Sequence, residues 1–286
     1  MTQGNEVAAR ETGQEVAVYD PGEDAGLGMQ NVTMDERRIP FLRILDPKSP
    51  QCKPPNAGGI PGARGGSMFN TSTGQVYDGE KGVFFVPTSR DHKFVEYITR
   101  NEDGSGGGFV GVHEPDEPLV LQLRAQHGRF GKLPVPNTTP PQELVETFSL
   151  YGIVITPDGE QFRCIVGFSS TQIKKYTGFI DRYDNIQYDG PNRRIKPALW
   201  AHRWHLKTTY EQKGGNSWYG WVITLAEKNP DGSEAPPIKS RLSLKDPLYI
   251  AGKDFYNLIV AGAAKADYAK QAPDAQANDD DNEIPL

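Results

Sequence analysis

The sequence is poor in cysteine and has no long apolar run. Its 286 residues include only two cysteines, Cys52 and Cys164, and their spacing matches no metal-binding or redox motif. We therefore expect a reduced, cytoplasmic setting, while a disulfide between the two stays open. No apolar run approaches the ~18 residues of a membrane span, so no membrane partner is expected. Residues 1–28 lack the basic start and the apolar segment of a secretory signal.

Motifs of the common enzyme classes are missing as well. The sequence has no phosphate-binding loop, no nucleophile elbow and no paired cysteine and histidine clusters. The His-Glu-x-Asp stretch at 113–116 has no second group of ligands at a suitable spacing, so we expect no metal and no cofactor. A metal-dependent nuclease that uses Asp181, Asp184 and Asp189 is kept as an alternative. The sequence favours a protein that binds over one that catalyses.

Charges of the two signs are unevenly distributed along the chain. Residues 1–34 contain six acidic residues against one arginine, and residues 274–286 contain five acidic residues and no base. Since the net charge of the whole chain is −6, the body between these ends carries +4. The two ends also lack the apolar surface that offsets the entropy of folding. We expect a disordered acidic leader over 1–34, a single domain over 35–270 and a disordered acidic tail over 271–286.

Turn-forming residues divide the body into short segments, with 31 glycines and 23 prolines in the chain. Pro157-Asp158-Gly159 is typical of a hairpin turn, and predicts strands at 147–156 and 161–168. A second hairpin is predicted around 213–216. Its strands would cover 197–210 and 217–226. Further strands are predicted at 67–71, 75–77, 82–87 and 93–99, and residues 39–45 are predicted to form a strand or a short helix.

Two helices are predicted beside these strands. In 172–183 the residues Ile173, Tyr176 and Ile180 share one face, and 254–270 has a similar pattern. No regular alternation of strand and helix appears, so we predict a mainly β protein with minor α content. The first choice is an OB-like small barrel with long decorating loops, an inter-strand helix and a C-terminal helix. A β-sandwich is the alternative.

The stretch from Arg163 to Lys213 combines cations with aromatic rings. It contains ten Lys or Arg against four acidic residues, and all four tryptophans of the chain lie between 200 and 221. Cations neutralise phosphates and rings stack on bases, which are the two needs of a single-stranded nucleic-acid site. The alternative is that the rings form the core. The candidate phosphate contacts are Lys174, Lys175, Arg193, Arg194, Arg203 and Lys207, and the candidate stacking residues are Trp200, Trp204, Tyr210, Trp218, Tyr219 and Trp221.

The end of the chain carries a more specific pattern. An acidic run is followed by Ile-Pro and a large apolar residue, formed by Asp279, Asp280, Asp281, Glu283, Ile284, Pro285 and Leu286. This pattern resembles the acidic C-terminal tip of bacterial and phage single-stranded-DNA-binding proteins, which ends in Ile-Pro-Phe. Leu286 stands in place of the final aromatic residue. The resemblance implies that this tail binds replication or recombination proteins.

The body shows a more diffuse likeness. The segments 40–45 (Pro-Phe-Leu-Arg-Ile-Leu), 69–74 (Phe-Asn-Thr-x-Thr-Gly), 82–87 (Gly-Val-x-x-Val-Pro) and 170–175 (Ser-Thr-Gln-Ile-Lys-Lys) resemble phage-encoded single-stranded-DNA-binding proteins. The likeness is spread over residues 38–180. It implies the activity and identifies no individual contact residue.

Taken together, these patterns predict a sequence-tolerant single-stranded-DNA-binding protein and no enzyme. The resemblance implies that it protects single-stranded DNA in phage replication, recombination or repair, in the cytoplasm of an infected bacterial host. Homo-oligomers are compatible with this function. The alternatives are a strand-annealing recombination protein and a phage structural or assembly protein.

Overall fold

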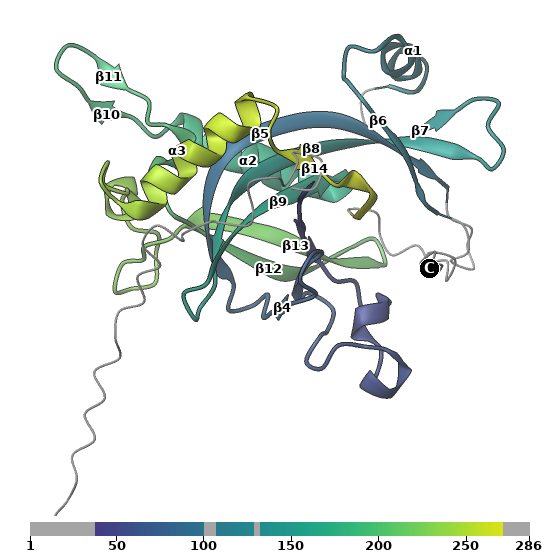
Figure 1. The fold of residues 1–286 in the computed structure, drawn as a ribbon, viewed down its shortest axis with the longest axis horizontal. Coiled ribbons are helices and arrows are strands. Elements are labelled where there is room, and N and C mark those ends of the chain that lie inside the picture. Colours follow the sequence, from purple (N-terminus) through teal and green to yellow (C-terminus); the bar gives the residue numbers. More distant parts are fainter. Residues whose placement is uncertain (1–37, 100–106, 129–131, 271–286) are drawn as a thin grey trace, which may run out of the picture.

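The structure is a computed structural model that describes residues 38–99, 107–128 and 132–270. It is mainly β, as predicted, and its main sheet curls into a half-barrel (Figure 1). Eight strands follow one another across the half-barrel: β13 (Asn216–Leu225), β12 (Trp204–Lys213), β5 (Val83–Ile98), β8 (Gln142–Ile155), β9 (Gln161–Ser169), β2 (Phe41–Ile44), β3 (Met68–Asn70) and β4 (Val76–Tyr77).

The remaining strands extend or decorate this sheet. β6 (Phe109–His113) pairs with β5, and β7 (Lys132–Val135) pairs with β8. Neighbouring strands of the main sheet are antiparallel, except that β2 and β9 are parallel. Two short pairs lie outside it: β1 (Arg38–Ile39) with β14 (Lys265–Ala266), and β10 (Tyr188–Asp189) with β11 (Arg194–Ile195). The sheet is continuous, in contrast to the two stacked sheets of the sandwich alternative.

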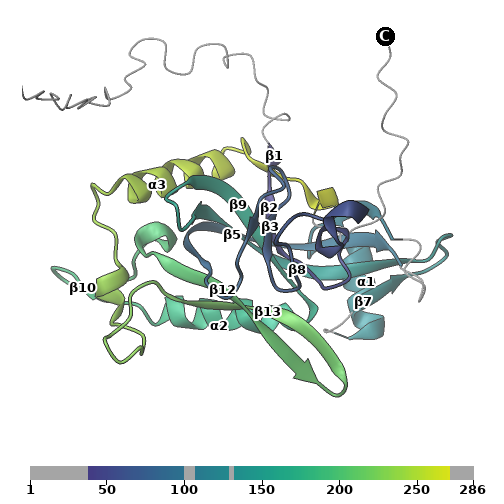
Figure 2. The ribbon, with the colours of Figure 1, turned by 90° about the horizontal axis from the view of Figure 1, so that it is seen from below.

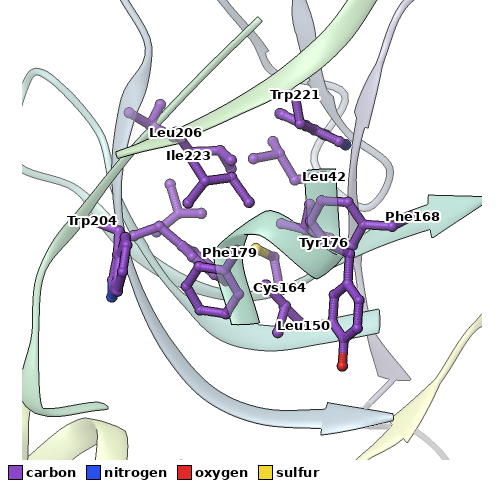
Figure 3. Close-up of a cluster of buried hydrophobic side chains, with 14 of the residues drawn as sticks. Leu42, Leu150, Cys164, Phe168, Tyr176, Phe179, Trp204, Leu206, Trp221 and Ile223 are labelled. Carbon is purple, nitrogen blue, oxygen red and sulfur yellow. The ribbon is translucent and has the colours of Figure 1, made fainter. Parts of the chain in front are cut away.

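Helices cover both faces of the half-barrel (Figure 2). On the concave face α2 (Ile173–Asp184) buries Tyr176 and Phe179 against the sheet, and the edge of the Phe179 ring meets Trp204 with the centroids 4.8 Å apart (Figure 3). On the convex face α3 (Pro247–Val260) buries Phe255. The third helix, α1 (Pro118–His127), covers a smaller cluster around Phe94. Alternate residues of the central strands β5, β8, β9 and β2 therefore contribute to two separate cores, one on each face of the sheet.

Several predicted boundaries differ from the structure. The segments at 82–87 and 93–99 belong to one long strand, β5, which carries an irregularity between Pro87 and Ser89. The predicted strand over 197–210 begins only at Trp204, because 199–201 form a turn of 3₁₀-helix. The C-terminal helix begins earlier than predicted, where Asp246 caps its first turn by accepting a hydrogen bond from the Leu248 amide (2.9 Å).

Some predictions concern residues that the structure does not describe. The leader at 1–34 and the tail at 271–286 lie outside the described residues, as does most of the loop at 101–108. No helix in the described part of the chain is long and apolar enough to span a membrane. The two cysteines are not joined by a disulfide, since Cys164 is buried in the concave core and Cys52 ends a turn of 3₁₀-helix (Pro50–Cys52).

The outer edge of β13 is covered by side chains rather than by another strand. Gln172 lies in the 3₁₀ turn Ser170–Gln172 that leads into α2. Its Oε1 accepts a hydrogen bond from the Trp221 amide (2.9 Å), and its Nε2 donates to the Tyr219 carbonyl (3.5 Å). One glutamine thus occupies two of the edge positions that a neighbouring strand would use.

Two charged side chains continue this cover along the same edge. Arg182 Nη1 donates to the Ile223 carbonyl (3.0 Å), and Glu234 Oε1 accepts from the Leu225 amide (2.5 Å). An uncovered edge strand is a template for pairing with other chains. The α2 segment and Glu234 remove that template and end the half-barrel at β13.

Candidate nucleic-acid interface

A cavity of about 480 Å³ lies at the opening of the half-barrel, between the edge of β13 and strand β2. We call it the seam cavity. The parallel pairing of β2 with β9 involves only Phe41 and Leu42, so the two strands diverge beyond this point and leave room. The seam cavity is lined by Phe41, Leu42, Arg43, Ile44, Asp46, Lys48, Ser49, Pro50, Gly167, Ser169, Gln172, Tyr219 and Trp221.

Tyr219 is fixed at the rim of the seam cavity by two glycines. A Cβ atom added to Gly66 would lie 2.4 Å from the Tyr219 ring, and one added to Gly65 would lie 3.0 Å from it. The ring therefore packs directly on the backbone of these residues, where no larger residue fits. Thr208 Oγ1 holds the same loop by donating to the Gly66 carbonyl (2.6 Å). The Tyr219 ring is therefore held in a fixed position, although it is only half-buried.

Tyr210 is the exposed partner of Tyr219. The two residues are directly opposite each other in the β12–β13 ladder, and their rings meet edge to face with centroids 5.5 Å apart. Tyr210 is 57% exposed, which makes it one of the most exposed large apolar residues in the described part of the chain. A ring that is held in orientation and open to solvent is suited to stacking on a base.

Two cations reach the seam cavity from β2 and the loop after it. Arg43 and Lys48 both line the cavity, together with the single acid Asp46. The Arg43 guanidinium also lies over the Phe69 ring, 5.8 Å from its centroid. Neither cation is among the residues predicted from the sequence, because both lie more than 150 residues before Tyr210 and Tyr219 in the chain. Only the folding of β2 towards β13 brings these groups together.

Trp218 faces the side of the hairpin opposite to Tyr219. Its indole Nε1 donates to Glu211 Oε2 (3.0 Å), and the other oxygen of Glu211 forms an ion pair with Lys175 of α2. Lys174, the neighbour of Lys175, is exposed. The carboxylate of Glu211 thus already neutralises one predicted phosphate contact, and leaves Lys174 as the more accessible cation of α2.

Two of the predicted stacking residues belong to the core. Trp204 is 0% and Trp221 is 2% exposed, and both pack in the concave core (Figure 3). A ring without an open face cannot stack on a base, so the prediction is corrected for both. Trp200 is half-buried and packs between α3 and the sheet, with its centroid 5.1 Å from that of Tyr256. Among the six predicted rings, Tyr210, Trp218 and Tyr219 remain.

The predicted phosphate contacts are divided among several surfaces. Lys207 lies on the face of β12 opposite to Tyr210, because successive side chains alternate. Arg203 donates to Glu227 Oε1 (2.6 Å) and lies 4.6 Å from the Phe84 centroid. Arg193 and Arg194 lie on the β10–β11 hairpin, which Figures 1 and 2 place at the end of the molecule opposite to the β12–β13 turn. The tail residues 279–286 lie outside the described residues.

The predicted acids do not gather into a metal site. Within the described residues no three His, Cys, Asp or Glu side chains are grouped so as to hold a metal ion. Asp184 pairs with Lys196, and Asp189 lies 3.9 Å from Arg194. His113 lies between Glu96 (2.8 Å) and Glu117 (2.9 Å). Burial lowers the pKa of His113, but hydrogen bonds to both carboxylates outweigh burial and raise it above its usual value.

Comparison with known proteins identifies the family. The family model described as Pam3 phage gp34-like protein matches residues 9–265. No curated protein and no solved structure matches the chain. The matched residues cover most of the chain, which confirms the phage origin that the resemblance implied. The chain belongs to the Pam3 phage gp34-like protein family.

Proposed function

We propose that this phage protein binds single-stranded DNA along the β12–β13 hairpin and across the seam cavity. The observation that carries the proposal is the pair formed by Tyr210 and Tyr219. An exposed ring is held edge to face on a second ring, which in turn is fixed at the rim of a cavity lined by two cations. The same site can thus stack on a base and neutralise the phosphates next to it.

The arrangement suits a single strand better than a duplex. A stacked base must be unpaired for its face to meet the Tyr210 ring, and duplex DNA keeps its bases inside. The cations Arg43 and Lys48 lie on the far side of the cavity from the hairpin, where they would meet phosphates of the same strand. Ring faces accept any base, so the binding is sequence-tolerant.

The tail extends this proposal to partners. Residues 279–286 carry four carboxylates followed by Ile284, Pro285 and Leu286. A polyanion on the same chain competes with DNA for the cations of the body, which has a net charge of +4. DNA that displaces the tail would make its apolar end available to replication or recombination proteins. With this role we expect the protein to act in the cytoplasm of the infected host.

The experiment is a titration of labelled oligo-dT with the full-length protein at several salt concentrations, with a blunt duplex of equal length in parallel. We expect binding to oligo-dT to weaken with salt, with log K falling by about 0.7 for each phosphate neutralised per unit of log salt. The blunt duplex should bind more weakly. Equal affinity for both would contradict the single-strand proposal, and no binding to either would favour the phage structural alternative.

A strand-annealing protein would use the same chemistry but would also pair complementary strands. Mixing two complementary oligonucleotides, one of them labelled, with and without the protein separates the two functions. We expect no acceleration of pairing by the protein. Acceleration would favour the annealing alternative.

A further inference from the structure

The residues from 187 to 197 form a hairpin, here called the arm, that stands away from the half-barrel (Figure 1). Its strands β10 and β11 pair Tyr188 with Ile195 and Asp189 with Arg194. The hairpin closes at its tip through a hydrogen bond from the Gly190 amide to the Arg193 carbonyl (3.0 Å). The seam cavity includes no residue of the arm, so the proposed single-strand path leaves its function open.

The first strand of the arm is anchored to the body by an aromatic contact. The Tyr188 ring stacks on His202, with an interplanar angle of 9°, and its hydroxyl lies 2.6 Å from His202 Nε2. The Arg241 guanidinium lies over the same Tyr188 ring, 4.9 Å from its centroid. Because His202 is fully buried, the root of β10 is attached to the core of the protein.

The second strand is anchored as firmly. Lys196 forms an ion pair with Asp184 at the end of α2 and lies 4.8 Å from the Tyr183 centroid. The Tyr183 hydroxyl donates to the Pro197 carbonyl (2.7 Å), which fixes the point where the chain returns to the body. Both roots are therefore held, and the arm projects in a defined direction.

The tip is small, basic and exposed. All residues from 191 to 196 are exposed, and Arg194 has 75% of its side chain accessible. A Cβ added to Gly190 would lie 2.3 Å from the Ile195 side chain, so a larger residue at this position would force the hairpin apart. Arg193 and Arg194 stand next to each other at this narrow end, with Asp189 as the nearest acid at 3.9 Å from Arg194.

We propose that the arm contacts duplex DNA that continues from the bound single strand towards the arm end of the molecule, with Arg193 and Arg194 on the phosphates or base edges of the major groove. A two-stranded ribbon has the width that the major groove admits, whereas the body of the protein is too wide to enter it. Two exposed arginines on an anchored ribbon supply the charge. The preferred ligand is then a duplex that ends in a single-stranded tail. This inference rests on the proposed function and adds the substrate class.

The experiment compares three kinds of labelled ligand: a blunt duplex, oligo-dT, and two tailed duplexes, which are the same duplex with a 3′ or with a 5′ dT tail of equal length. Wild-type protein should bind the better of the two tailed duplexes more tightly than it binds oligo-dT. The double variant Arg193→Ala/Arg194→Ala should lose about tenfold in affinity for the tailed duplex, and its log–log salt slope should become shallower by about 2. Its affinity for oligo-dT should stay at the wild-type value.

The matched control is Lys132→Ala/Lys253→Ala, which removes the same charge from exposed positions on β7 and α3. This control should bind all three kinds of ligand as the wild type does. An equal loss for tailed duplex and oligo-dT would overturn the proposal by placing the two arginines on the single-strand path. Unchanged binding of every ligand by the arginine variant would also overturn it.

Two further outcomes keep the two proposals separate. If oligo-dT does not bind but the blunt duplex binds in an arginine-dependent way, the single-strand function fails and the arm's contact with duplex DNA stands. If the arginine variant instead changes the oligomeric state in sedimentation without DNA, the arm is a contact between copies of the chain. That result would overturn the duplex proposal.

Discussion

The side chain of Gln172 substitutes for a neighbouring strand at Trp221: its Oε1 accepts the hydrogen bond of the Trp221 amide over 2.9 Å. The amide belongs to the terminal strand of the half-barrel, next to the seam cavity. The same glutamine also lines that cavity. Stability of the sheet edge and shape of the proposed binding site thus depend on one residue.

Gln172→Ala should destabilise the protein by about 1 kcal/mol, because it leaves the Trp221 amide without its partner. The measurement is urea unfolding followed by circular dichroism. Gln212→Ala is the control, since Gln212 is exposed near the hairpin turn and should change stability by less than about 0.5 kcal/mol. Equal stabilities for the two variants would show that the edge contact contributes nothing.

Trp204→Ala and Tyr210→Ala distinguish the core from the surface of the same strand. Trp204 is 0% exposed, so its loss should cost about 3–5 kcal/mol of unfolding free energy. Tyr210→Ala should cost about 1 kcal/mol or less of unfolding free energy, because Tyr210 is 57% exposed and its loss removes mainly the contact with Tyr219. Thermal or denaturant unfolding measures both. A mild effect of Trp204→Ala would mean that this ring is not in the core.

His202 should make the protein less stable in mild acid. Burial, together with the nearby Arg241 charge, lowers the pKa of His202 to about 4, while the unfolded value is near 6.5. A lowered pKa means that the unfolded chain binds the proton more readily. The contribution of neutral, buried His202 to the free energy of unfolding is therefore fully present above about pH 6.5, and it is lost as the pH falls towards 4.

The check is the unfolding free energy between pH 7 and pH 4.5 for the wild type and for His202→Gln. The variant should show a smaller decrease over this range, because the titrating group is gone. Its arm should also be less firmly held, since the contact with Tyr188 is altered. Identical pH profiles would exclude His202 as the source of the acid sensitivity.

Removal of the tail should strengthen DNA binding at low salt. A variant that ends at Lys270 lacks the acidic run that competes for the cations of the body. We expect it to bind oligo-dT more tightly than the full chain at about 50 mM salt, with the difference shrinking as salt screens the competition. A full-length variant with Asn at 279–281 and Gln at 283 should behave like the truncated one. If only the truncated variant binds oligo-dT more tightly, competition by the charge of the tail is excluded as the cause.

The fold class could be predicted because hairpin turns and strand alternation are local properties. The Pro157-Asp158-Gly159 turn and the 213–216 turn each connect the strands that were predicted. The C-terminal helix was placed too late because its start depends on Asp246 and Pro247, whose capping role was not considered. The predicted small barrel is present as an open half-barrel. The strand at which it opens could not be predicted, since it depends on the side chains of Gln172 and Arg182 meeting the edge of β13 across the fold.

The candidate site could be predicted only in part. Composition pointed to the hairpin that the proposed site uses, but it could not tell which of its rings face the core, because Trp204 and Tyr210 lie on the same side of one strand. Their exposure differs because Phe179 of α2 packs on Trp204, whereas Tyr210 contacts Tyr219 and is 57% exposed. Arg43 and Lys48 were missed because a contact between β2 and β13 has no local signature in the sequence.

The most direct test of the proposed site is the affinity of Tyr210→Ala for oligo-dT, compared with that of the wild type and of Tyr256→Ala. Tyr256 is the matched control, an exposed tyrosine on α3 at the convex face. We expect Tyr210→Ala to lose about 1–3 kcal/mol of binding free energy, Tyr256→Ala to lose none, and Tyr210→Trp to recover binding because it restores a stacking face. Wild-type affinity in a folded Tyr210→Ala protein would contradict the proposed site.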